Sequence, residues 1–234
     1  MPFMYRENTT DEKVIDEILN RKAYKKKNIN FDAEPGDIWL DGGAQIGIFA
    51  EYAAKKGSKK IYCFEPEKSN FELLEKNTNY LKKKYDVEII NDKRAITQSD
   101  GKALLHIAPN TWRHAINTHY KKELKKQLID CVAFDNILQI YSDINAIKLD
   151  IEGSELEILE NEHDFRNIKK LVFEYSFTKN RRMDDFFHCI EILKKHFEIK
   201  IQNSFHNQKH KGEKGLWGGF IDQIIFCKKP GLNY

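Results

Sequence analysis

The order of apolar runs between residues 36 and 90 constrains the fold of this chain most strongly. Runs over 37–41, 61–64 and 87–90 have the length and composition of buried strands. Two segments in which apolar residues recur at helical spacing separate these three runs. Such an alternation predicts a parallel sheet with helices on both faces.

The rest of the chain repeats the pattern, with one interruption. Strands are expected over 146–149 and 171–173, helices over 154–159 and 184–196, and two last strands over 197–201 and 220–227. A long loop, not a helix, separates the last two strands, which predicts a terminal hairpin with one antiparallel strand. The interruption is 94–134, which reads as an insertion with a polar loop near the functional site.

The domain organisation follows from this order. Residues 1–35 are expected to form an N-terminal helical extension, with a helix over 11–27, and residues 36–234 a single α/β domain. We find no internal repeat and no second domain in the sequence.

Composition excludes several classes of protein. The 39 basic and 36 acidic residues leave a net charge of only +3, which argues against a nucleic-acid partner. No apolar stretch approaches the roughly 20 residues of a membrane span, and the N-terminus has no secretory signal, so a cytoplasmic location is expected. The four cysteines form no C-x-x-C pair and are expected to be buried free thiols.

The turn after the first strand predicts a nucleotide-like ligand. The sequence DGGAQIG over 41–47 has small residues that allow a tight turn and close approach of a ligand. Its D-x-G-x-x-x-G spacing differs from the dinucleotide fingerprint. The opening acid, Asp41, would repel a pyrophosphate and attract an ammonium group, which favours S-adenosylmethionine (SAM) over NAD. An ordinary tight turn would explain the glycines alone.

An acidic residue at the end of the second strand supports this interpretation. Glu65 lies about two dozen residues after the turn, where a carboxylate can accept hydrogen bonds from both ribose hydroxyls. Pro66 fixes the turn that follows and removes one competing donor. A simple helix cap is the alternative role for Glu65.

Three segments together resemble the FkbM family of SAM-dependent methyltransferases. They are DGGAQIG over 41–47, CFEPE over 63–67 and IKLDIEGSE over 147–155, and LVFE over 171–174 resembles the strand that comes next in the family. The resemblance implies a Rossmann-like class I methyltransferase fold, whose seven-stranded, mostly parallel sheet has the order 3-2-1-4-5-7-6. It also implies O-methylation, often of sugars or polyketide hydroxyls. Gly42 departs from the family, in which a β-branched residue is more usual.

Specific residues follow from the resemblance and from the turn. Asp41 falls on the family's methionine-side position and Glu65 on its ribose-side position. The predicted cofactor-binding residues are Asp41, Gly43, Ala44, Gly47, Glu65 and Pro66.

The chemistry requires a group that can activate a hydroxyl, because an alcohol is a poor nucleophile. Asp150 is the first candidate base, since it ends the fourth strand of the domain, where α/β sheets hold their ligands. Glu174 ends the neighbouring strand, and the two carboxylates are predicted to hold Mg²⁺ or another divalent cation if a metal is used. His114, in the polar insertion, is a second candidate base. Plain roles, a helix N-cap for Asp150 and a solvated loop residue for His114, stay open.

The sequence therefore predicts a SAM-dependent O-methyltransferase with a sugar or glycan hydroxyl as acceptor. The alternatives are an RNA or polyketide-like small-molecule methyltransferase and a non-catalytic SAM-binding module. The sequence leaves the acceptor, the metal and the oligomeric state open.

Overall fold

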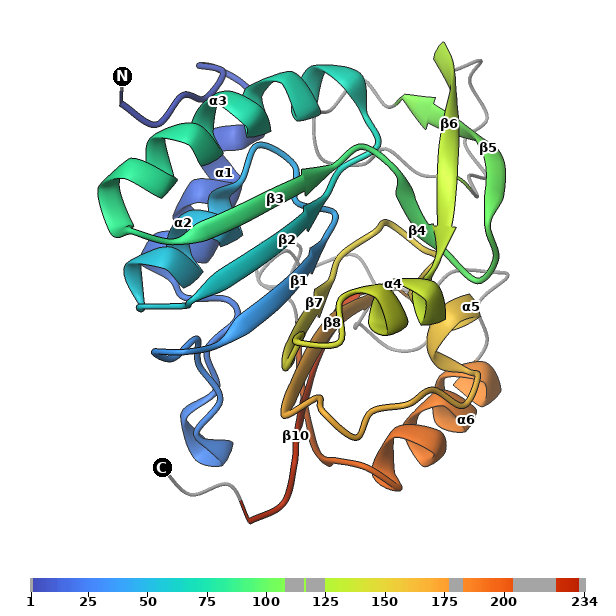
Figure 1. Ribbon diagram of the computed structural model, residues 1–234. Helices are drawn as coiled ribbons and strands as arrows, with labels where there is room; N and C mark the ends of the chain where they lie inside the picture. Colours follow the sequence, from blue (N-terminus) through green and yellow to red (C-terminus); the bar gives the residue numbers. More distant parts are fainter. Residues whose placement is uncertain (1, 108–115, 117–124, 177–182, 204–221, 232–234) are drawn as a thin grey trace, which may run out of the picture.

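The computed structural model describes residues 2–107, 116, 125–176, 183–203 and 222–231. In these ranges a central seven-stranded sheet has the order β3-β2-β1-β7-β8-β10-β9 (Figure 1). Numbered within the sheet alone, this is the predicted order 3-2-1-4-5-7-6. Its strands are β1 (Ile38–Gly42), β2 (Lys60–Phe64), β3 (Glu88–Asp92), β7 (Ala146–Leu149), β8 (Lys170–Ser176), β9 (Glu198–Asn203) and β10 (Asp222–Lys228).

Strand directions confirm the predicted terminal hairpin. The pairs among β3, β2, β1, β7 and β8 are all parallel. β10 runs antiparallel to both β8 and β9. The carboxyl ends of β1, β2, β7 and β8 therefore meet at one edge of the sheet, which we call the carboxyl edge; the opposite one is the amino edge.

Helices cover both faces of the sheet, as expected. α1 (Asp11–Ile15), α2 (Ile48–Lys55) and α3 (Lys68–Tyr85) lie on one side, and α4 (Phe134–Ile140), α5 (Glu155–Leu159) and α6 (Met183–Lys194) on the other (Figure 1). The start of α3 is fixed by its N-cap, Glu67, whose carboxylate accepts a hydrogen bond from the backbone N–H of Asn70. Its C-cap, Asp86, is left-handed and ends the helix.

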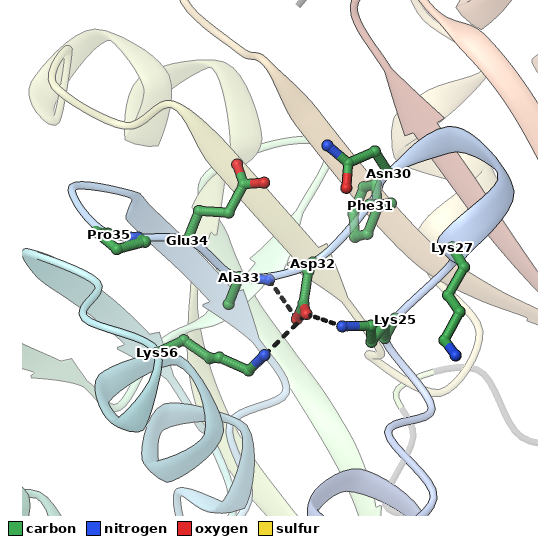
Figure 2. Close-up of a pocket in the computed structure, with 9 residues that line it drawn as sticks. All are labelled: Lys25, Lys27, Asn30, Phe31, Asp32, Ala33, Glu34, Pro35 and Lys56. Atoms are coloured by element: carbon green, nitrogen blue, oxygen red, sulfur yellow. Dashed lines mark hydrogen bonds and ion pairs between the residues drawn. The ribbon is translucent and has the colours of Figure 1, made fainter. Parts of the chain in front are cut away.

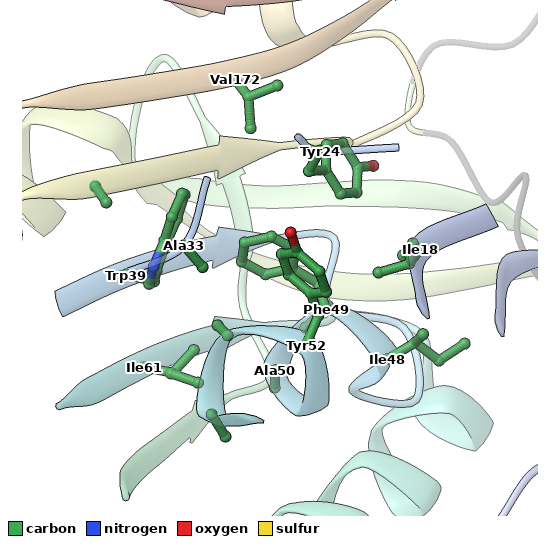
Figure 3. Packing of buried hydrophobic residues seen from close by; sticks show 14 of the residues in the cluster. Ile18, Tyr24, Ala33, Trp39, Ile48, Phe49, Ala50, Tyr52, Ile61 and Val172 are labelled. Carbon is green, nitrogen blue, oxygen red and sulfur yellow. The ribbon is translucent and has the colours of Figure 1, made fainter. Parts of the chain in front are cut away.

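Each face has its own hydrophobic core. On the α2 side, Trp39 of β1 packs edge-on against Phe49, which also contacts Tyr24 edge-on (Figure 3). Figure 3 shows Tyr24 between Val172 of β8 and Phe49 of α2. The other core includes Phe134, Phe165 and Phe173, with α4, α5 and α6 packed over it. The four cysteines are buried and free, as predicted.

The insertion after β3 is more regular than the sequence suggested. β4 (Ala95–Thr97), β5 (Gly101–Ile107) and β6 (Lys125–Ala133) form a second sheet in the order β4-β6-β5. Two apolar runs of the insertion, over 103–107 and 128–134, lie largely in β5 and β6, which pair antiparallel with Leu104 opposite Leu128. The polar loop between them lies outside the described residues, except for Ile116.

The N-terminal extension differs from the single helix predicted over 11–27. The α-helix stops at Ile15 and continues as a π-helix over Asp16–Asn20, and Lys22 then adopts a left-handed conformation that ends the helical stretch. Residues 23–33 follow as an irregular segment that contains a 3-10 helix (Lys27–Ile29) enclosed by an antiparallel bridge between Lys26 and Phe31. Tyr24 and Phe31 of this segment are buried. No helix in the described ranges has the length and apolar character needed to cross a bilayer.

Candidate functional site

The turn after β1 is built so that only glycine fits at its first residue, position 43. Gly43 has a φ of +73°, and a Cβ there would lie 1.9 Å from the backbone oxygen of Asp150. Its N–H and that of Ala44 both donate to the carbonyl of Phe64 at 3.0 Å, which ties the turn to the end of β2. Gly47, with a φ of +91°, is the N-cap of α2. The predicted turn residues therefore lie where three strand ends meet.

Packing explains the departure from the family pattern at Gly42. A Cβ at this position would lie 2.8 Å from the Cδ2 of Leu149 and 3.0 Å from the Cδ1 of Ile96. A β-branched residue would displace these apolar side chains. Large neighbours thus fill the space that a side chain at position 42 would need.

Asp41 is buried and ion-paired. Its Oδ1 lies 3.0 Å from the Nζ of Lys148, and neither side chain has more than 3% of its surface exposed. The same ammonium donates to the carbonyls of Gly42 and Gly43 at 3.1 and 2.8 Å. Burial opposes the charge of Lys148, but the carboxylates of Asp41 and Asp150 outweigh it and hold the pKa of the lysine above its ordinary value.

The ion pair is the contact that the structure shows for Asp41. Both carboxylate oxygens are inaccessible to solvent in this conformation, and the direct contact of Asp41 with a ligand ammonium stays a prediction. Asp41 pairs with Lys148, and Lys148 holds the backbone of the glycine turn. Sequence reasoning missed Lys148, although it lies inside the segment 147–155 that carries the resemblance.

Glu65 links the glycine turn to the start of α3. Its two carboxylate oxygens accept hydrogen bonds from the backbone N–H groups of Gln45 and Glu67, each at 2.8 Å. The residue is 6% exposed. Burial raises the pKa of Glu65 to about 7, although the two backbone donors act in the opposite direction. Pro66, next to it, accepts a hydrogen bond on its carbonyl from the side chain of Gln127.

Asp150 directly follows β7. Glu174 lies inside the neighbouring strand β8, two residues before its end at Ser176, whereas the sequence predicts it to end that strand. The two acids follow Leu149 and Phe173, which are register partners in β7 and β8. The hydroxyl of Tyr24 donates to Asp150 Oδ2 at 3.0 Å. Burial, followed by the charges of Asp150 and Glu174, raises the pKa of Tyr24 well above its ordinary value. The negative charges of Asp150 and Glu174 therefore both favour the protonated form of the buried Tyr24 hydroxyl.

Tyr24 is a second residue that sequence reasoning missed. It belongs to the N-terminal extension, 126 residues from Asp150 in sequence, and no local pattern marks it. The turn after Asp150 is in turn held by Glu155, whose carboxylate accepts hydrogen bonds from the N–H groups of Ile151 and Gly153 at 2.7 and 2.8 Å. Glu155 opens α5, as expected for an acid in a first helical turn.

The structure does not test two of the predictions about the site, the role of His114 and the binding of a metal ion. His114 lies outside the described residues. Among the residues that are described, no three or more histidine, cysteine, aspartate or glutamate side chains are grouped as metal ligands. Asp150 and Glu174 supply two oxygen-donor side chains, so a divalent cation there would take its other ligands from elsewhere.

A separate hollow of about 460 Å³ lies at the amino edge (Figure 2). At its centre Asp32 binds the ammonium groups of Lys25 and Lys56, at 2.7 and 2.9 Å. Its lining residues are Lys25, Lys27, Asn30, Phe31, Asp32, Ala33, Glu34, Pro35 and Lys56. This hollow is at the opposite edge from the glycine turn and contains none of the predicted site residues.

Comparison with known proteins gives a consistent result. The family model described as the methyltransferase FkbM domain matches residues 41–198. The chain resembles the solved structure of methyltransferase FkbM from Methylobacillus flagellatus KT, with a TM-score of 0.54 and 17% identity over 91% of this chain and 47% of that one. It also resembles the small RNA methyltransferase HEN1, with a TM-score of 0.52 and 10% identity over 100% of this chain and 28% of that one.

The similarity to these two solved structures supports a narrower conclusion than the match to the family model does. This chain spans about half the length of the FkbM structure, and at these identities both structures show the fold alone. No curated protein matches the chain significantly.

Proposed function

Because this chain belongs to the FkbM family of SAM-dependent methyltransferases, we propose that it transfers the methyl group of SAM to a hydroxyl oxygen of a sugar or glycan. The observation that carries the proposal is the meeting of three groups at the carboxyl edge: the Gly43 turn, the Glu65 carboxylate and the Asp150 carboxylate. In open α/β sheets, ligands bind at this edge.

The residues of the turn fit an adenosyl donor. The backbone of 43–47 would face the methionine portion, and Lys148 keeps that backbone fixed from below. The remaining acceptor positions of the Glu65 carboxylate would take the two ribose hydroxyls. Bound SAM supplies an electrophilic methyl group, so the protein has to place an oxygen in line with it.

Asp150 is proposed as the base that takes the proton of the acceptor hydroxyl. The hydrogen bond from Tyr24 occupies one side of its Oδ2 and so limits the rotation of the carboxylate, which leaves the other lone pairs for the acceptor. A positioned base contributes about 10²- to 10⁴-fold to rate. Glu174, near the carboxyl end of β8, would bind a neighbouring hydroxyl or, together with Asp150, a divalent cation.

The choice of a sugar rests on the family resemblance and on charge. An RNA acceptor would favour a strongly basic protein, and the net charge here is +3. The resemblance to HEN1 concerns the fold and does not extend to its substrate.

Two measurements test the proposal. Calorimetry with S-adenosylhomocysteine (SAH) should give a defined heat of binding. Tritium transfer from labelled SAM should then be assayed with free sugars, nucleotide sugars, a phenolic polyketide and a structured RNA, each with Mg²⁺ and with EDTA. Transfer to a sugar supports the proposal, transfer to RNA contradicts the acceptor, and loss of transfer in EDTA supports the metal.

The Asp150→Asn variant tests the base. We expect SAH affinity within about twofold of wild type, because Asp150 contacts the acceptor side, and turnover lower by about 100-fold or more. Unchanged turnover would remove Asp150 from the mechanism and leave the methyltransferase assignment intact.

A further inference from the structure

The N-terminal segment reaches the proposed cofactor site, although it lies outside the family-matched residues 41–198. Two chains of hydrogen bonds begin at Arg6 and end at Glu65. One passes through Asp11 and Gln45, and the other through Asn70.

The first chain begins with an ion pair whose carboxylate is buried. The guanidinium of Arg6 donates to both oxygens of Asp11, from Nε at 2.8 Å and from Nη2 at 3.0 Å. The Asp11 side chain has 0% of its surface exposed. Its Oδ1 also accepts a hydrogen bond from the side-chain amide of Gln45 at 3.2 Å, and the backbone N–H of Gln45 donates to Glu65. A single residue, Gln45, therefore links Asp11 to the carboxylate of Glu65.

The second chain is shorter. Arg6 Nη2 donates to the side-chain oxygen of Asn70 at 2.8 Å. The side chain of Asn70, which is 1% exposed, in turn hydrogen-bonds Glu65 and lowers its pKa. One arginine thus acts on both routes, and a bidentate guanidinium–carboxylate pair gives it a fixed orientation.

Gln45 shows why this support is needed. Its φ is +50°, which is a left-handed backbone conformation. For any residue other than glycine this conformation is unfavourable in free energy, and it persists only where surrounding contacts stabilise it. In this conformation its N–H points at Glu65. The side-chain amide of Gln45 donates to Asp11, so Gln45 is hydrogen-bonded through both its backbone and its side chain.

We propose that the Arg6–Asp11 pair is a positioning device for the cofactor site, which holds Gln45 and Asn70 so that the carboxylate of Glu65 faces the ribose of the adenosyl ligand. The inference rests on the proposed function, since it takes Glu65 as the residue that binds the ribose. Asp11 itself contacts no ligand and acts through Gln45.

The Asp11→Ala variant is the test, with Asp32→Ala as the matched control. Both carboxylates belong to the N-terminal segment and bind cationic side chains, but Asp32 lies at the amino edge. By calorimetry we expect SAH affinity to fall by about tenfold or more in Asp11→Ala, the order of one charge-assisted hydrogen bond, and to stay within about twofold in Asp32→Ala. Thermal melting checks that both variants are folded, and both should melt at a lower temperature than wild type because each loses a charge pair.

A ligand without ribose hydroxyls separates positioning from general damage. With the 2′,3′-dideoxy analogue of SAH, the effect of Asp11→Ala should shrink to less than about twofold, because Glu65 then has no hydroxyl to orient. If Asp11→Ala fails to fold, Gln45→Met cuts the same chain, keeps the Arg6–Asp11 pair, and should weaken SAH binding by several-fold, on the order of one hydrogen bond.

The outcomes distinguish failure of the proposed function from failure of the positioning role of the Arg6–Asp11 pair. Wild-type protein that binds no SAH would overturn the proposed function and this inference with it. Wild-type protein that binds SAH, with Asp11→Ala and Gln45→Met binding it equally well, would overturn the inference alone. An equal loss for SAH and for the dideoxy analogue would also overturn it, since Asp11 would then act on the whole site.

Discussion

Titration of Glu65 gives a quantitative test of the cofactor site. Burial raises its pKa to about 7, and the ribose hydroxyls of the adenosyl ligand donate hydrogen bonds that favour the ionised carboxylate. With a pKa of about 7, roughly one molecule in ten is ionised at about pH 6 and nine in ten at about pH 8. We therefore expect SAH to bind up to about tenfold more tightly at pH 8 than at pH 6.

The same group makes a prediction about stability with a definite sign. The pKa of Glu65 in the folded protein lies above the value of 4.5 for an unperturbed glutamate, so the folded state holds this proton more tightly. The contribution of Glu65 to the free energy of unfolding is therefore greatest below about pH 4.5. It is lost as the pH rises through about 7, and a shift of this size is on the order of 3 kcal/mol.

Calorimetry and urea denaturation of wild type and Glu65→Gln at several pH values would measure both effects. A glutamine keeps the shape but does not titrate, so the difference between the two proteins isolates Glu65 from every other ionisable group. Equal pH dependence of SAH affinity in the two proteins would refute the assignment of Glu65 to the ribose. Equal pH dependence of their unfolding would refute the raised pKa.

Three substitutions test other parts of the site and fold. Gly43→Ala drives a Cβ into a backbone oxygen 1.9 Å away and should abolish measurable SAH binding, whereas Gly36→Ala, also at positive φ but in open space, should not. Tyr24→Phe should lower methyl transfer and leave SAH affinity within about twofold, with Tyr52→Phe, another buried tyrosine bound to a carboxylate, as the control in the transfer assay. Lys170→Met leaves two carboxylates without their buried ammonium and should cost about 3–5 kcal/mol in urea denaturation, with SAH affinity unchanged in the folded protein.

The sequence predicted the central sheet well because its inner strands β1, β2, β7 and β8 are largely buried on both faces. Such strands are short continuous apolar runs, and Ala146–Leu149 was located to the residue. The strand order came from the family resemblance, since apolar runs do not show which strands are neighbours. The glycine turn and Glu65 were also located, because positive φ and a strand-end carboxylate leave signals in local sequence.

Contacts between distant segments were not predictable. Arg6 hydrogen-bonds Asn70, which lies 64 residues away in the sequence, and Tyr24 hydrogen-bonds Asp150, which lies 126 residues away. The residues next to them in the sequence form no motif that indicates these contacts. The pairing of Leu104 with Leu128 was missed for a different reason: both side chains are about half exposed or more, so the strands lack clear alternation. The π-helix after Ile15 has no sequence signal that we recognise.

The distribution of charge between the two edges of the sheet bears on which ligand the carboxyl edge prefers. At the amino edge Lys170 is bound by Glu34 and Asp37, and Asp32 is bound by two lysines, so the charges there largely cancel.

At the carboxyl edge, in the part of the chain that the structure describes, the ammonium of Lys148 is matched by Asp41, and Arg6 is matched by Asp11. The carboxylates of Asp150 and Glu174 add negative charge beside them, and Glu65 adds more when it is ionised. A negative potential attracts a sulfonium cation and repels the phosphates of a dinucleotide or of RNA. SAM should therefore bind more tightly than its neutral-sulfur product SAH at low ionic strength, and added salt should reduce that difference. If affinity for the two ligands were equal at every salt concentration, the excess negative charge would have no part in selecting the donor.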